Sequence, residues 1–120
     1  MTIVGALVVG ALAAVGAYLL MHRTLLRIVL GIAMLGNAVN LLIVGAGSAA
    51  GPAPILDTAG RAPGDAADPV PQALVLTAIV IGFSVVAFLL AIAYRSWTID
   101  GNDEVEDDIS DRLLDTEEPA

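Results

Sequence analysis

The chain has 120 residues, 58% of them hydrophobic, and a mean hydropathy of +0.86. Only 15% of its residues are charged, against about 25% in ordinary soluble domains. Small domains bury only about 60% of their unfolded surface, so this much apolar surface cannot be hidden in a soluble core. A soluble globular protein is therefore excluded. The absence of cysteine also excludes disulfides, thiolate metal sites and cysteine nucleophiles.

Three uncharged stretches follow one another along the chain: Thr2–Met21, Ile28–Ala46 and Ala73–Tyr94. Each is long enough to cross about 30 Å of hydrocarbon. Each must be helical, because lipid offers no partner to bare backbone groups, and the alternation typical of a membrane barrel is absent. The first stretch lacks a basic leader and is longer than a signal-peptide core, which indicates a retained helix. The sequence predicts an all-α membrane protein with three transmembrane helices.

These helices are expected at about residues 2–21, 28–46 and 69–94, within a three-helix membrane domain over residues 1–99. The third helix has a start signal in which Asp68 is the N-cap acceptor and Pro69 the first helical residue. Pro71 and Gln72 complete this helix-start motif. The preceding link, from residue 47 onward, is rich in Ala, Gly and Pro and predicts an irregular loop.

The arginines predict the orientation of the chain. Arg23 and Arg27 lie in the short link between the first two helices, and Arg95 closes the third, whereas the long link holds only Arg61. Because cytoplasmic loops carry the excess of positive charge, we expect the N-terminus outside and the C-terminus in the cytoplasm.

The residues near the cytoplasmic interface predict membrane anchors. Trp97, just past the third helix, fits an aromatic belt, and the arginines anchor to headgroups or pair with a partner's acids. His22 is either a snorkelling anchor or a pH-sensitive contact. The predicted anchors are His22, Arg23, Arg27, Arg95 and Trp97.

Ten of the 13 acidic residues lie between Asp100 and Glu118. Residues 100–120 therefore predict a flexible, solvated cytoplasmic tail that is repelled by anionic lipid. The four-residue spacing of Val105, Ile109 and Leu113 leaves open an amphipathic helix that docks on a partner.

Polar side chains within the spans are few, namely Asn37, Asn40, Thr77 and Ser84. Asn37 and Asn40 either clamp helices together or border a hydrated ion path supplied mainly by a partner. Asparagine does not titrate, so neither residue can relay a proton. The span cores hold no carboxylate, which excludes a rotor-ring hairpin and a small multidrug exporter.

The first helix carries small residues at four-residue spacing, Ala6, Gly10 and Ala14 on one face and Ala13 and Ala17 on another. Such stripes allow close helix packing, although alanine and glycine are also common in membrane helices generally. Three thin helices cannot enclose an aqueous pathway, so we expect this chain to be part of a larger assembly.

Two runs carry a family resemblance: GIAMLGNAVNLLIVG over Gly31–Gly45, and DPVPQALVLTAIVIGF over Asp68–Phe83. Over roughly residues 2–97 the chain resembles the C-type subunits (MrpC, MnhC) of the Mrp-type (Mnh, Sha) multisubunit sodium/proton antiporters. It is also similar to the small K-type (4L) subunit of NADH:quinone oxidoreductase. The K-type relatives carry two intramembrane glutamates, and the matching positions here are Ala33 and, approximately, Gly82.

The resemblance implies a non-catalytic subunit that packs beside large antiporter-like subunits in a prokaryotic cell membrane. The complex is expected to exchange cytoplasmic Na⁺ for external H⁺, and the other subunits carry the titrating residues. The chain itself is expected to have no cofactor, no metal site and no nucleic-acid partner. The alternatives are a 4L-type subunit of a proton-pumping redox complex, disfavoured by the missing glutamates, and a free-standing membrane scaffold.

Overall fold

The computed structural model describes residues 2–47, 50–105 and 113. They contain the helices α1 (Ile3–Leu20), α2 (Leu25–Ala46) and α3 (Pro69–Asp100). Each helix is long and apolar enough to cross a membrane. The described residues form no strand beyond one isolated β-bridge. The predicted all-α, three-span architecture is confirmed.

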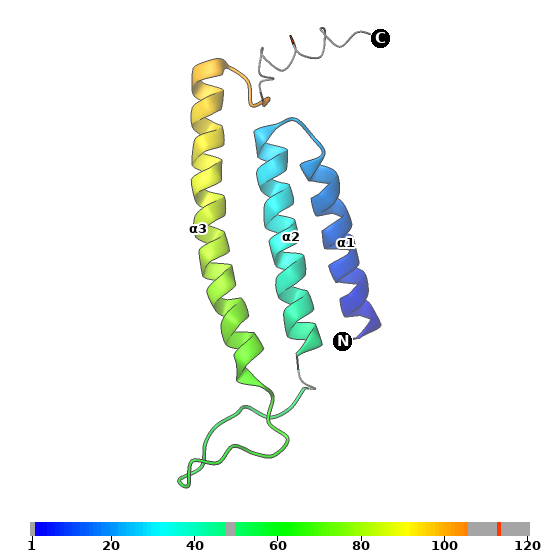
Figure 1. The fold of residues 1–120 in the computed structure, drawn as a ribbon, viewed down its shortest axis with the longest axis vertical. Coiled ribbons are helices and arrows are strands. Elements are labelled where there is room, and N and C mark those ends of the chain that lie inside the picture. The colour runs from blue at the N-terminus through cyan, green and yellow to red at the C-terminus, as the bar shows by residue number, and fades with distance from the viewer. Residues whose placement is uncertain (1, 48–49, 106–112, 114–120) are drawn as a thin grey trace.

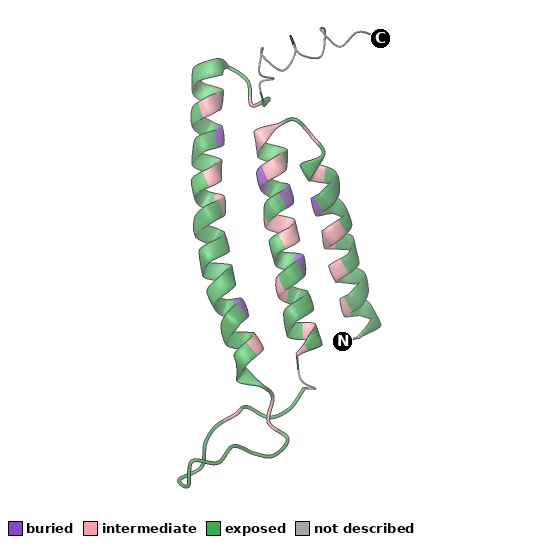
Figure 2. Ribbon diagram, viewed as in Figure 1, coloured by how far each residue is buried: buried purple, intermediate pink, exposed green. Residues whose placement is uncertain are grey.

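The helices lie side by side in one layer, with α2 between α1 and α3 (Figure 1). Among the described residues α2 packs against both neighbours, whereas α1 and α3 do not contact each other. Little of the layer is buried (Figure 2), and even in α2 only 17% of the most apolar window is covered. The buried hydrophobic side chains are those of Val29, Ala38, Val75 and Ala93. Nearly all of the apolar surface therefore faces outward.

α1 and α2 cross closely where Gly16 meets Gly31. A Cβ atom added to Gly31 would lie 2.8 Å from the Gly16 carbonyl oxygen, and one added to Gly16 would lie 3.1 Å from the Gly31 oxygen. Backbones come this near only where neither residue has a side chain. The stripe of Ala6, Gly10 and Ala14 is exposed and does not form this contact. Its role in helix packing stays a prediction.

α2 begins at Leu25, three residues before the expected start, so Arg27 lies in the helix and not in the link. The uncharged stretch begins only after Arg27, but arginine is a good helix former whose stem can lie along apolar surface. Thr24 is the N-cap residue, and the Leu25 N–H donates to the Asp103 carbonyl oxygen at 2.7 Å. This bond gives an otherwise unpaired donor of the first turn a partner.

α3 begins at Pro69, and the side chain of its N-cap Asp68 accepts a hydrogen bond from the Val70 N–H at 3.0 Å. The helix continues to Asp100, six residues beyond the expected end, so Trp97 lies within α3 and not past it. Its 32 residues extend about 48 Å, whereas hydrocarbon is about 30 Å thick. Hydropathy marks the end of the apolar stretch and therefore missed the turns of α3 that continue beyond it. The actual stop is Gly101, at φ +74°, whose N–H donates to the Trp97 carbonyl.

The segment after α3 returns to the short link between α1 and α2. The Leu25–Asp103 bond has a counterpart in the Val105 N–H, which donates to the Arg23 carbonyl oxygen at 2.8 Å. Thr24 and Glu104 lie opposite each other in the antiparallel bridge. We call residues 102–105 the clasp. The clasp lies at the start of the predicted flexible tail, and its backbone is hydrogen-bonded to residues 23 and 25. The flexibility of residues 100–120 stays a prediction. Ile109 and most of the predicted docking helix lie outside the described residues.

Candidate functional site

Three of the four predicted polar side chains of the spans bond to their own helices. Asn37 Nδ2 donates to the Ala33 carbonyl oxygen at 2.9 Å. The Thr77 and Ser84 hydroxyls donate to the carbonyls four residues earlier, at 3.1 Å each. All three residues are exposed. Among the described residues none of these side chains bonds to another helix, so a clamp by Asn37 would have to act on another subunit.

Asn40 lies on the side of α2 that faces α3. Gly47, seven residues later, contacts Pro71 at the start of α3, because an added Cβ atom would lie 3.4 Å from that ring. Leu26 lines a groove shared with α3 at the other end of α2. Ala33 and Asn40 fall between them at seven-residue spacing and therefore share this face. Asn40 is half-buried there, whereas Asn37 is exposed.

The positions that match the glutamates of the 4L relatives carry no titratable group. Ala33 is half-buried on the α3-facing side of α2. A Cβ atom at Gly82 would meet nothing within 4 Å, and α3 is exposed from Leu76 to Val85. Within the part of the chain that the structure describes, the middle of the layer therefore offers no acid or base for proton transfer.

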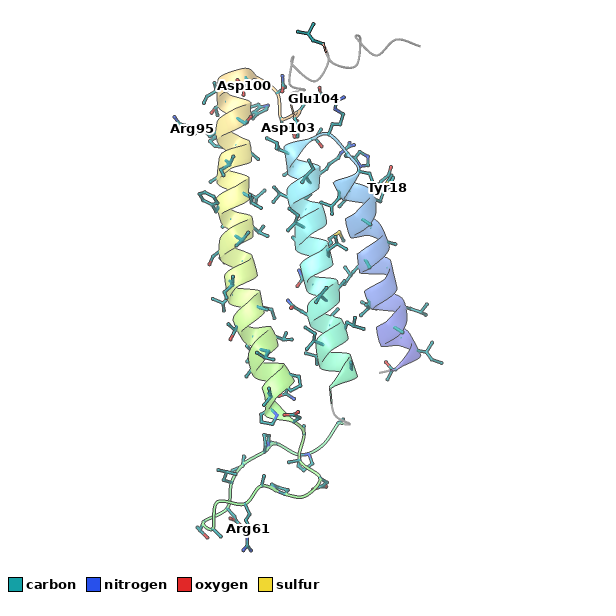
Figure 3. The ribbon with its side chains drawn as sticks, viewed as in Figure 1. Tyr18, Arg61, Arg95, Asp100, Asp103 and Glu104 are labelled. Atoms are coloured by element: carbon teal, nitrogen blue, oxygen red, sulfur yellow. The ribbon has the colours of Figure 1, made fainter. Side chains whose placement is uncertain are left out.

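The predicted interface anchors gather at the end of the bundle that carries the short link. His22 Nδ1 lies 3.0 Å from the Tyr18 carbonyl oxygen, and the two rings meet edge to face with centroids 4.7 Å apart. Arg23 belongs to the link that the clasp covers, and Arg27 follows in the first turn of α2. Arg95 lies on the outward side of α3 (Figure 3). The tyrosine contact of His22 could not be inferred from its position alone.

Sequence reasoning missed the groove between α2 and α3 at this same end. Its walls come from both helices and from the clasp, and they consist of Leu26, Leu90, Ala93, Tyr94, Trp97 and Asp103. The Tyr94 and Trp97 rings are 6.4 Å apart and inclined by 35°. The spacing of these two residues on one helix was visible in the sequence, but the approach of Asp103 depends on the return of the chain.

Comparison with known proteins defines the class of this chain. The family of NADH-ubiquinone/plastoquinone oxidoreductase chain 4L matches residues 4–109, so the chain belongs to this family. It is 40% identical over 107 residues to the C1 subunit of a Na⁺/H⁺ antiporter of Staphylococcus aureus, and the match covers 88% of this chain and 92% of that protein.

Two solved assemblies contain chains of the same fold. One is the Mrp complex from Dietzia sp. DQ12-45-1b, with a TM-score of 0.73, 30% identity, and 98% of this chain and 95% of that chain covered. The other is the membrane-bound sulfane sulfur reductase, an archaeal respiratory membrane complex, with a TM-score of 0.72, 34% identity, and coverage of 90% and 98%. This chain is therefore similar to subunits of multisubunit membrane complexes.

Proposed function

We propose that this chain is a non-catalytic, multi-pass membrane subunit of a cation/proton antiporter that exchanges cytoplasmic Na⁺ for external H⁺. The observation that carries this proposal is the 40% identity over 107 residues to a Na⁺/H⁺ antiporter subunit. The structural likeness to a chain of an Mrp complex supports it.

The absence of titratable side chains from the span cores supports the non-catalytic role. Ala33 and, approximately, Gly82 match the intramembrane glutamates of the K-type relatives, and Asn37 and Asn40 cannot titrate. Proton transfer then belongs to other subunits. This chain contributes an apolar surface on which other subunits can pack. Only 17% of the most apolar window of α2 is buried within the chain, and only 6% of the corresponding windows of α1 and α3. In the assembly this surface packs against antiporter-like subunits and lipid.

The proposal is tested by antiport in inside-out membrane vesicles from a strain in which only this chain is deleted. We expect addition of Na⁺ to stop collapsing a preformed pH gradient, and a plasmid copy of the full chain to restore the response. The matched control is a plasmid copy with a stop codon after Met1. Unchanged Na⁺-driven proton movement in the deletion strain would overturn the proposal.

A second candidate is a membrane subunit of a respiratory complex, favoured by the 34% identity to a chain of the archaeal reductase. The same deletion distinguishes the two functions. A respiratory subunit would lower proton pumping driven by electron transfer and leave Na⁺-driven antiport unchanged. The absence of a carboxylate at residue 33 and near residue 82 makes this candidate the weaker one.

A further inference from the structure

A groove of about 460 Å³ opens between α2 and α3 at the end of the bundle that carries the short link. Leu26 forms its α2 side, and Leu90 and Ala93 form the α3 side. It is an open groove and not an enclosed cavity, because Leu26 and Trp97 keep 48% and 54% of their surfaces exposed. The transport role proposed above makes no use of it.

The walls of the groove change in polarity along α3. Leu90 and Trp97 are seven residues apart on α3, about 10 Å of helix. The part of the groove at Leu90 is aliphatic, and the Tyr94–Trp97 ring pair follows toward the end of α3. Such rings are enriched at the membrane–water interface. Asp103 lies beyond the end of α3, where the clasp closes one end of the groove. An occupant must therefore be apolar at the end that lies near Leu90 and cationic at the end that lies near Asp103.

The charge around the groove determines which lipid fits. Asp100 and Glu104 stand close to Asp103 in the chain and are also acidic (Figure 3). The nearest cation on α3, Arg95, lies on the outward side of that helix. Arg23 and Arg27 belong to the same end of the bundle, but Asp103 is the one charged residue among the described residues that line the groove. Its carboxylate disfavours an anionic headgroup there. A terminal ammonium group would be attracted by the carboxylate and by the faces of the two aromatic rings.

We propose that this groove binds a zwitterionic phospholipid whose headgroup ends in an ammonium group, of the phosphatidylethanolamine class. Its acyl chain lies against Leu26, Leu90 and Ala93, and its ammonium group is held at Asp103 beside Tyr94 and Trp97. The proposal does not depend on the transport role, because it concerns only this groove and the bilayer around it.

Trp97 is the only tryptophan of the chain and lines the groove, which makes it a direct probe. The full chain is placed in vesicles that contain equal fractions of either phosphatidylethanolamine or phosphatidylglycerol, brominated on the acyl chain near the headgroup. Bromine quenches tryptophan at short range. We expect the brominated phosphatidylethanolamine to occupy the groove about two- to fivefold more readily, the range of an exposed charge pair.

Asp103→Asn is expected to abolish this preference. The matched control is Asp100→Asn, which alters a carboxylate that does not line the groove and is expected to keep the preference. Helix content measured by circular dichroism confirms that both variants fold. Equal quenching by the two lipids in the unaltered chain would overturn the proposal, as would a preference that survives Asp103→Asn.

The assembled complex supplies a second test, in which a photoreactive benzoylphenylalanine replaces Tyr94. An adduct with the aminophospholipid supports the proposal. An adduct with a basic segment of another subunit overturns it and identifies the groove as a protein interface.

Discussion

Asn37 is the most informative single residue of the membrane core. Its amide donates to the Ala33 carbonyl of its own helix, and the residue is exposed. It therefore does not hold the three helices of this chain together. Its effect, if it has one, is on another subunit or on a hydrated path beside it.

We predict that Asn37→Leu changes the free energy of unfolding of the isolated full chain by less than about 0.5 kcal/mol, as for surface positions without a structural role. Unfolding in mixed detergent micelles, followed by circular dichroism, measures this. A loss above about 1 kcal/mol would show a role inside the chain that the structure does not contain. If Asn37→Leu reduces antiport in vesicles while the complex stays assembled, Asn37 borders a hydrated ion path. If the complex no longer assembles, Asn37 clamps this chain to another subunit.

The Gly16–Gly31 crossing gives a second prediction at this scale. Gly31→Ala places a methyl group 2.8 Å from the Gly16 carbonyl oxygen, so the helices must separate. We expect a cost of about 1–3 kcal/mol in unfolding free energy from this overpacking. Gly10→Ala is the matched control, because its added Cβ atom meets nothing within 4 Å.

The same mixed-micelle unfolding measurement compares the two glycine variants. Both gain the same helix propensity from alanine, so their difference isolates the cost of the crossing. Equal stabilities for the two variants would show that α1 and α2 do not approach closely at Gly16 and Gly31.

At the scale of elements, the clasp joins the end of α3 to the start of α2. Two backbone hydrogen bonds, from Leu25 to Asp103 and from Val105 to Arg23, link segments about 80 residues apart in the chain. Because α1 and α3 do not contact each other among the described residues, the clasp is an additional connection between α3 and the α1–α2 hairpin.

Two truncations test the clasp. Removing residues 106–120 leaves both hydrogen bonds, whereas removing 102–120 removes both and keeps the C-cap Gly101. We expect only the longer truncation to lower the free energy of unfolding, by about 1–3 kcal/mol at about 0.5–1.5 kcal/mol per bond. Antiport in vesicles should remain largely intact in both, because no titrating residue of the membrane core is removed. Equal stability of the two truncated chains would contradict the role of the clasp, and a sharp drop in antiport would contradict the expectation for transport.

The start of α3 is a further element-level prediction. Asp68→Ala removes the side-chain acceptor of the Val70 N–H, so α3 should lose about 0.5–2 kcal/mol of stability. Asp65→Ala is the control, since Asp65 lies in the loop outside the cap. Thermal unfolding of the two variants, followed by helix content, measures the difference. If Asp65→Ala lowers the stability as much as Asp68→Ala does, the loss of stability does not come from the missing N-cap.

The elements also show what sequence reasoning could and could not reach. Hydropathy placed all three helices, and Asp68–Pro69 marked the start of α3, because these signals are local. The Gly16–Gly31 crossing was missed because spacing within one helix does not say which stripe faces its neighbour. The clasp and the groove were missed because each depends on Asp103 returning to the start of α2, a contact distant in sequence.

At the scale of the whole molecule, the chain is a layer without a core of its own. Only 6% of the most apolar windows of α1 and α3 is buried, and the interior of the spans carries no acid or base. Such a layer suits a subunit that other membrane subunits and lipid cover. The central claim is therefore that this chain belongs to an antiporter assembly.

Co-purification tests this claim most directly. The full chain, tagged at its C-terminus, is expressed at native level and extracted in a mild detergent, and the proteins that accompany it are identified by mass spectrometry. We predict large antiporter-like membrane subunits together with several small membrane proteins. Peripheral flavin or iron–sulfur subunits would assign the chain to a redox complex, and purification without any partner would contradict both assignments.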